Sequence, residues 1–213
     1  MIKTIMIGDS VLYGALGSGS GPLGCGRVSP HPQEVLNAQQ NVFDFCYNYS
    51  MPGASLANLL SDDQGLRVTA GMPTGCTLSD LLISHPDAQA VLVNIGGNDT
   101  GDTLYADLTT LANTLIQFGK LFAFVGIIDV SVKQSMFNTG YVGNPAPYLD
   151  SAKRIASNAE ILRQFCGINS YPYVDIRKLV QVDLNNITGD IIHPNQAYSE
   201  AIFTKVAKAI TGQ

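Results

Sequence analysis

The sequence has no tryptophan and few charged residues, which make up 14% of its 213 positions, against about 25% in an average soluble protein. Basic residues are especially scarce: 12 Lys and Arg stand against 17 Asp and Glu, for a formal net charge of -5. Proteins that bind nucleic acid need a basic surface to neutralise phosphates, so this composition argues against that class. A hydrophobic fraction of 46% argues equally against disorder, because such a chain can bury a core.

Long apolar runs are also absent. The longest nearly apolar run, Leu121 to Ile128, is far shorter than the roughly 18 residues that indicate a membrane span. The N-terminal stretch from Met1 to Ser10 is too short and too soon interrupted to serve as a secretory signal peptide. We therefore expect a soluble protein, cytoplasmic by default, with action outside a cell or on a virion as the alternative.

Cysteine usage gives no sign of a metal centre. The four cysteines form no CxxC pair and show no metal-ligand spacing with the three histidines, so no metal site is predicted. Free thiols are the expectation. Cys25 and Cys76 both lie in glycine-rich stretches, and a disulfide between them is left open, because a sequence does not give the distance between two Cα atoms.

Hydrophobic periodicity predicts an alternation of strands and helices. Buried strands are indicated by short apolar runs at Ile2 to Ile7, Val42 to Asn48, Ala90 to Ile95, Leu121 to Ile128 and Tyr171 to Ile176. Helical spacing occupies the stretches between and after them, at Ser55 to Leu60, Thr77 to Ser84, Thr103 to Gly119, Tyr148 to Cys166 and Asn195 to Ile210. This order predicts an α/β protein, a three-layer α/β/α sandwich around a mostly parallel five-stranded sheet. No linker divides the chain, so residues 1–213 are expected to form one domain.

Two long loops interrupt this pattern. Ala15 to Pro32 is rich in Gly, Ser and Pro, and Gln134 to Pro147 carries Phe137 and Tyr141. Loops of this length in a compact domain are often functional, so both are expected to border a cleft. Whether the aromatic side chains of the second loop stack on a substrate or pin that loop to the core is left open.

Three short motifs place reactive side chains at the ends of predicted elements. Gly8-Asp9-Ser10 follows the first strand, and Gly96-Gly97-Asn98-Asp99 follows the third. Asp190-Ile191-Ile192-His193 immediately precedes the last helix. A serine on a strand-to-helix turn, an amide donor at the same sheet edge and an Asp–His pair make up the set that a hydroxyl nucleophile needs.

These motifs resemble the conserved blocks of the SGNH hydrolases, also called the GDSL esterase/lipase family. The first block, usually Gly-Asp-Ser-Leu, corresponds to Gly8 to Val11, the third to Gly96 to Asp99 and the fifth to Asp190 to His193. The second block, centred on a glycine, is similar to Asn48 to Ser55 and is the least specific match. The resemblance spans nearly the whole chain and implies the flavodoxin-like SGNH hydrolase fold.

The resemblance also implies a role for each matching residue. Ser10 would be the nucleophile, His193 the base and Asp190 its partner. The oxyanion hole would combine the backbone N–H groups of Ser10 and Gly53 with the side chain of Asn98. Neither a cofactor nor a metal is implied.

Three positions depart from the family pattern without removing a catalytic group. Val11 replaces the usual Leu, and Ala197 stands where relatives often carry Gly. Pro52 precedes Gly53 and restricts the backbone there, which leaves the direction of the Gly53 N–H open.

Each motif also has an interpretation without catalysis. In this alternative, Ser10 starts or caps a helix, Asn98 forms an Asx-turn, and His193 caps the last helix ahead of Pro194. Asp9 and Asp99 are predicted to be structural, bonding the turns that carry Ser10 and Asn98. His31 and His85, each beside a proline and with no carboxylate at useful spacing, are expected to be surface residues.

The sequence therefore predicts a serine esterase that works through an acyl-enzyme. Polar loops favour a small ester or glycan ester, foremost an O-acetylated carbohydrate, as the binding partner. The alternative within enzymes is a short-chain lipid esterase, lysophospholipase or thioesterase. The alternative of another class is a catalytically silent carbohydrate-binding module on the same scaffold.

Overall fold

A five-stranded sheet forms the centre of the protein, whose computed structural model describes residues 1–16, 26–61, 77–128, 146–179 and 193–212. The strand order is β4-β1-β5-β6-β7, and every neighbouring pair is parallel. These strands span Ile2–Gly8 (β1), Phe43–Ser50 (β4), Ala90–Asn94 (β5), Leu121–Val125 (β6) and Tyr173–Val174 (β7). A small antiparallel ribbon joins Ala15–Leu16 (β2) to Gly26–Arg27 (β3).

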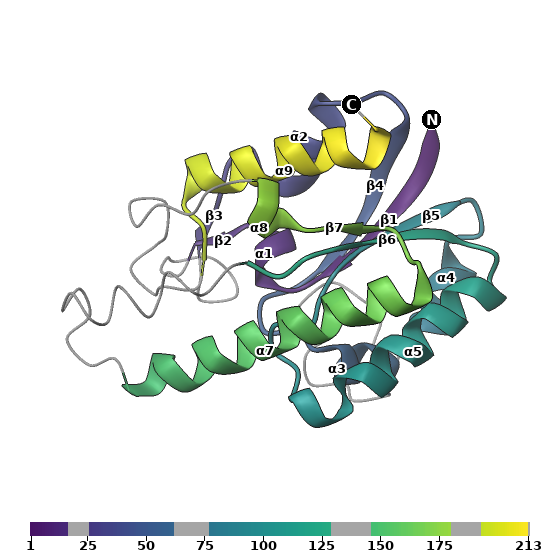
Figure 1. Cartoon of the computed structure of the whole chain (residues 1–213). Helices are drawn as coiled ribbons and strands as arrows, with labels where there is room; N and C mark the ends of the chain where they lie inside the picture. The colour runs from purple at the N-terminus through teal and green to yellow at the C-terminus, as the bar shows by residue number, and fades with distance from the viewer. Residues whose placement is uncertain (17–25, 62–76, 129–145, 180–192, 213) are drawn as a thin grey trace.

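Helices cover both faces of this sheet (Figure 1). One layer contains Ser10–Tyr13 (α1), Pro32–Ala38 (α2), Ile176–Leu179 (α8) and Gln196–Thr211 (α9). The other contains Leu56–Leu60 (α3), Leu78–Ser84 (α4), Gly101–Gln117 (α5) and Ala146–Asn169 (α7). The predicted α/β sandwich with a mostly parallel sheet is thereby confirmed. Among the described helices, none combines the length and hydropathy of a membrane span.

One strand end differs from its prediction and one helix was not predicted, each for an identifiable reason. The fourth strand was expected to continue to Ile128 but ends at Val125, where the buried Asn94 amide donates to the carbonyl oxygens of Val125 and Gly126. Helix α2 was not predicted, and only Pro32, Val35 and Leu36 of its seven residues are buried. Its apolar stripe is too short to stand out in the sequence.

The core is divided between the two faces of the sheet. Ile5 and Ile7 of β1 pack in the layer of α3, α4, α5 and α7, whereas Met6 packs in the layer of α2 and α9. Successive side chains of a strand point to opposite faces, so one buried strand contributes to both cores. This explains why β1 is continuously apolar in sequence rather than alternating.

The strand ends bring three loops together. In the ladder, Gly8 pairs with Ser50 on one side and with Asn94 on the other. The pairing continues one residue further, because Met51 N donates to Gly8 O at 3.0 Å and Asp9 N donates to Asn94 O at 3.0 Å. The chain moves from β1 outward to β4 and then back across to β5, and such a reversal is where ligands bind in open α/β sheets.

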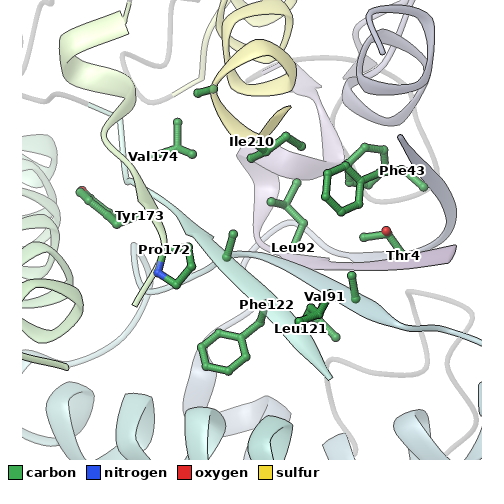
Figure 2. A pocket seen from close by; sticks show the side chains of 14 residues that line it. Thr4, Phe43, Val91, Leu92, Leu121, Phe122, Pro172, Tyr173, Val174 and Ile210 are labelled. Carbon is green, nitrogen blue, oxygen red and sulfur yellow. The ribbon is translucent and has the colours of Figure 1, made fainter. Parts of the chain in front are cut away.

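An apolar cavity of about 400 Å³ lies toward the other end of the sheet. Its lining includes Thr4, Phe43, Leu92, Phe122 and Ile210 (Figure 2). It is bounded by the N-terminal halves of β1, β4, β5 and β6, by β7 and by the C-terminal end of α9. The sequence motifs follow the opposite ends of these strands, so this cavity is separate from the site they form.

Candidate active site

Ser10 begins α1 at the end of β1. Asp9 is the N-cap of this helix, and its carboxylate accepts a hydrogen bond from Val11 N at 2.9 Å. Asp9 therefore fixes the turn that carries Ser10, as predicted, and Ser10 occupies the first helical position rather than the cap. An N–H at that position has no partner within its own helix.

Gly8 allows the tight join between β1 and α1. A Cβ atom on Gly8 would lie 2.7 Å from Leu12 Cβ and 2.8 Å from the backbone oxygen of Asn94. Because one of these neighbours is backbone, a larger residue would force the strand end to shift. Crowding therefore explains why the residue two positions before Ser10 is a glycine.

The second loop forms a tight turn across Met51 to Ala54. Ala54 N donates to Met51 O at 3.1 Å, and Gly53 has φ +79°. Proline at the second turn position followed by a residue with positive φ is typical of a type II turn, so Pro52 fits this geometry. The turn uses the Ala54 N–H and leaves the exposed Gly53 N–H outside it.

The third loop is bound to the second by hydrogen bonds. Asn98 Nδ2 donates to Ala54 O at 2.9 Å, so the Asn98 side chain reaches the residue that follows Gly53 instead of forming an Asx-turn. The Asp99 carboxylate accepts from Leu56 N at 2.8 Å and from Ala57 N at 3.2 Å. Asp99 is structural, as predicted, but it holds the N-terminus of α3 rather than its own turn.

His193 lies two residues before the cap of α9. The cap is Asn195, whose side chain accepts from Tyr198 N at 2.9 Å, so the alternative of His193 as the cap is wrong. The imidazole is close enough to Asp9 for its charge to lower the pKa of that carboxyl. His193 therefore lies beside the turn that carries Ser10.

Several sequence predictions concern positions outside the described residues. Asp190 is among them, as are Cys25, Cys76 and most of the loop from Gln134. Ser10, Gly53, Asn98 and His193 are all described. Both described cysteines, at 46 and 166, are free thiols as expected.

The electrostatics beside Ser10 are dominated by the buried Asp9. Burial raises the pKa of its carboxyl to about 6, while the Val11 N–H, the charge of His193 and the Gly97 N–H lower it. Burial also raises the pKa of Asp99, against the Leu56 N–H that lowers it. Two desolvated carboxyls thus flank the loops at this edge.

The other two histidines have structural partners. His31 is the N-cap of α2, with its Nδ1 3.4 Å from Glu34 Oε2, so the expectation that it has no carboxylate nearby is wrong. His85 stacks on Tyr47, with ring centroids 3.9 Å apart, and hydrogen-bonds the hydroxyl of Tyr49.

The described end of the first long loop is joined to the start of α9. Ser29 N donates to Gln196 Oε1 at 2.5 Å, and Gln196 Nε2 donates to Pro30 O at 3.5 Å. Gln196 follows His193 by three residues. Residues 29 and 30 therefore lie beside the start of α9, three residues after His193, and whether the loop borders a cleft stays a prediction.

Sequence reasoning missed one residue of this region, Asn158 of α7. Its amide nitrogen donates to Gly96 O at 2.7 Å and to Asp99 O at 2.8 Å. The available signal was an amide in the apolar stripe between Ile155 and Leu162. Within the described ranges, no group of three or more His, Cys, Asp or Glu residues is arranged to hold a metal ion.

Comparisons with known proteins agree with this geometry. The sequence profile of the GDSL-like lipase/acylhydrolase family matches residues 6–201, while a search of curated proteins finds no significant match. The inhibitor-bound aryl esterase of M. smegmatis superposes with a TM-score of 0.69 at 14% identity, covering 100% of this chain and 99% of its own. A carbohydrate acetylesterase from Sinorhizobium meliloti gives 0.66 at 13% identity, with coverage of 100% and 99%. The psychrotrophic esterase EstA from Pseudoalteromonas sp. gives 0.62 at 17% identity, with coverage of 98% and 97%.

Proposed function

The chain belongs to the GDSL-like lipase/acylhydrolase family, and from that premise we propose that it is a serine esterase with Ser10 as nucleophile. His193 is the base and Asp190 orients it. The observation that carries the proposal is the register of three strand ends, Gly8, Ser50 and Asn94. Through it, the loops with Ser10, Gly53 and Asn98 meet at one edge of the sheet.

The proposed reaction is a two-step acyl transfer. Ser10 Oγ attacks the ester carbonyl carbon while His193 takes the hydroxyl proton. His193 then gives that proton to the departing alcohol, and an acyl-enzyme remains. Water, deprotonated by the same imidazole, attacks the acyl carbon, and the carboxylic acid leaves as Ser10 regains its proton.

The oxyanion formed in each step is held by three donors. These are the N–H groups of Ser10 and Gly53 and the amide of Asn98. One Asn98 amide proton is used by Ala54 O, and an amide nitrogen carries two protons, so the second is available to the substrate. A donor of this kind contributes a factor of about 10² to 10³ to the rate.

The proposed substrate is an O-acetyl ester on a carbohydrate. The support is the polar composition of the long loops and the absence from the sequence of a Leu- or Phe-rich lid. One structural neighbour is described as a carbohydrate acetylesterase, and others are described as an aryl esterase and a psychrotrophic esterase. At these identities the likeness gives the fold, so a short-chain lipid ester or thioester is the second candidate.

The test compares wild type with Ser10→Ala on p-nitrophenyl acetate, butyrate and octanoate, without added metal. We expect acetate hydrolysis to be lost in S10A, because no other group supplies the nucleophile. Ser84→Ala is the matched control, since Ser84 is an exposed serine of α4 and its loss should leave hydrolysis unchanged. Equal turnover by S10A and wild type contradicts the proposal.

Two further outcomes separate the alternatives. Octanoate hydrolysis much faster than acetate hydrolysis would favour a lipid ester over an acetylated sugar. An inactive wild type whose Ser10 also fails to react with a fluorophosphonate would favour the silent carbohydrate-binding module.

A further inference from the structure

Asn158 is an amide completely buried in the middle of α7. Ile155 and Leu162, which precede and follow it on the same helix, are buried apolar residues of the core. A helix packed only for stability would carry an apolar side chain at this point, because a buried amide must recover its hydrogen bonds from the protein.

The Asn158 amide bonds the loop that carries Asn98. Its nitrogen uses both protons, one on Gly96 O at 2.7 Å and one on Asp99 O at 2.8 Å. These two carbonyl groups lie on either side of Asn98 in the chain. The Asn158 Oδ1 atom, in contrast, has no hydrogen-bond partner among the described residues. The hydrogen bonds of this side chain are therefore donated by its nitrogen.

The same loop is also bonded to the second loop. Asn98 Nδ2 donates to Ala54 O, and the Asp99 carboxylate accepts from Leu56 N. The backbone on either side of Asn98 is therefore bonded to α7, while the Asn98 side chain is bonded to the turn containing Gly53. Loss of the two hydrogen bonds from Asn158 would let the loop shift, and the second amide proton of Asn98 would then point in another direction.

We propose that Asn158 is a positioning residue for the oxyanion donor Asn98. The inference rests on the proposed esterase function. Asn158 acts through the carbonyl groups of Gly96 and Asp99 and does not touch the substrate. Its removal is expected to impair the transition state more than substrate binding, because oxyanion donors act on charge that develops during the reaction.

The test is a double-mutant cycle on p-nitrophenyl acetate with Asn158→Leu and Asn98→Ala. N158L alone is expected to lower kcat about 10- to 100-fold while KM changes by less than about twofold, since small misplacements of reacting groups cost rates of this order. In the N98A background, N158L should lower kcat by less than about threefold. Non-additivity of this kind indicates that one residue acts through the other.

Two variants separate positioning from stability. Leu162→Ala removes a buried side chain of the same helix, and we expect it to lower the melting temperature without a comparable loss of kcat. Asn158→Ser retains one donor, so its loss of kcat should be smaller than that of N158L and should also vanish with N98A. If N158L does not fold, N158S takes its place in the double-mutant cycle with N98A. Additive losses in the cycle, or a loss of kcat in L162A equal to that in N158L, would overturn the proposal.

A spectroscopic measurement keeps this proposal distinct from the proposed function. The side-chain amide resonances of Asn98 can be assigned by their disappearance in N98A. They are expected to shift in N158L, or in N158S if that variant replaces it, and not in L162A. If wild type shows no Ser10-dependent hydrolysis, the esterase proposal fails and this shift still tests the contact. Unshifted resonances in the Asn158 variant would overturn the positioning role, whatever the activity.

Discussion

At the residue scale, Asp9 combines a structural role with an unfavourable charge. Its carboxylate is almost fully buried, caps α1 and lies close to His193. Burial raises its pKa to about 6 from an ordinary 3.8. The turn that presents Ser10 is therefore held by a group that is costly to ionise at neutral pH.

This pKa predicts how stability changes with pH. Below pH 3.8 the carboxyl is neutral in both folded and unfolded chains. Between pH 3.8 and about 6 the unfolded chain ionises first, so stability falls as pH rises, and above that range the loss is complete. The shift corresponds to a loss on the order of 3 kcal/mol.

Asp9→Asn should remove this dependence. We expect the free energy of unfolding of D9N, measured by urea denaturation from pH 4 to 7, to fall less steeply across the window than that of wild type. Asp102→Asn, which removes an exposed carboxylate in the first turn of α5, controls for the loss of one charge. If the free energy of unfolding depended on pH in the same way in wild type and D9N, the prediction that Asp9 titrates with a raised pKa would be wrong.

At the element scale, the two glycines at the site are required for different reasons. Gly8 has no room for a Cβ atom against Leu12 and the Asn94 carbonyl, whereas a Cβ on Gly53 would meet nothing within 4 Å. Gly53 instead has φ +79°, which costs other residues about 1 to 2 kcal/mol.

A pair of alanine variants separates crowding from backbone conformation. Gly53→Ala should lower the free energy of unfolding by about 1 to 2 kcal/mol. Gly8→Ala should cost more, because relief requires the ends of β1 and β5 to move apart, and overpacking commonly costs about 1 to 3 kcal/mol or more. Denaturant unfolding of both proteins gives the comparison. A smaller loss for G8A than for G53A would show that the β1–α1 join is not tightly packed.

The elements also show what a sequence can predict. Strands β1 and β5 were found because strands buried on both faces are continuous apolar runs, and the other three were found from short runs rich in β-branched and aromatic residues. Helix α9 was placed within one residue. Ribbon β2–β3 and helix α2 were missed, because elements with so few buried residues leave little pattern.

Among the site residues, Ser10, Gly53 and Asn98 were predicted from motifs at strand ends. Asn158 was not, because its partners are backbone carbonyls about 60 residues away in the chain, and helical spacing alone does not indicate them.

At the scale of the whole molecule, the two core layers share one sheet. Leu108 of α5 and Ile202 of α9 are both fully buried, in opposite layers. We propose that residues 1–213 unfold as one domain, because β1 and β5 contribute side chains to both layers. Loss of either layer would expose the other face of the same strands.

Large-to-small substitutions in each layer test this cooperativity. Leu108→Ala and Ile202→Ala should each lower the free energy of unfolding by about 2 to 5 kcal/mol. In both proteins, far-UV circular dichroism and tyrosine fluorescence should report a single, coincident transition. Two separated transitions in either variant would mean that the layers unfold independently.

The ends of the described chain have a practical consequence. Met1 and the C-terminal end of α9 lie at the same end of the molecule (Figure 1), beside the first residues of the strands. Ser10, Gly53 and Asn98 follow the last residues of those strands. A bead, carrier protein or membrane tether attached through either terminus would therefore hold the protein with the loops of Ser10, Gly53 and Asn98 turned away from the support.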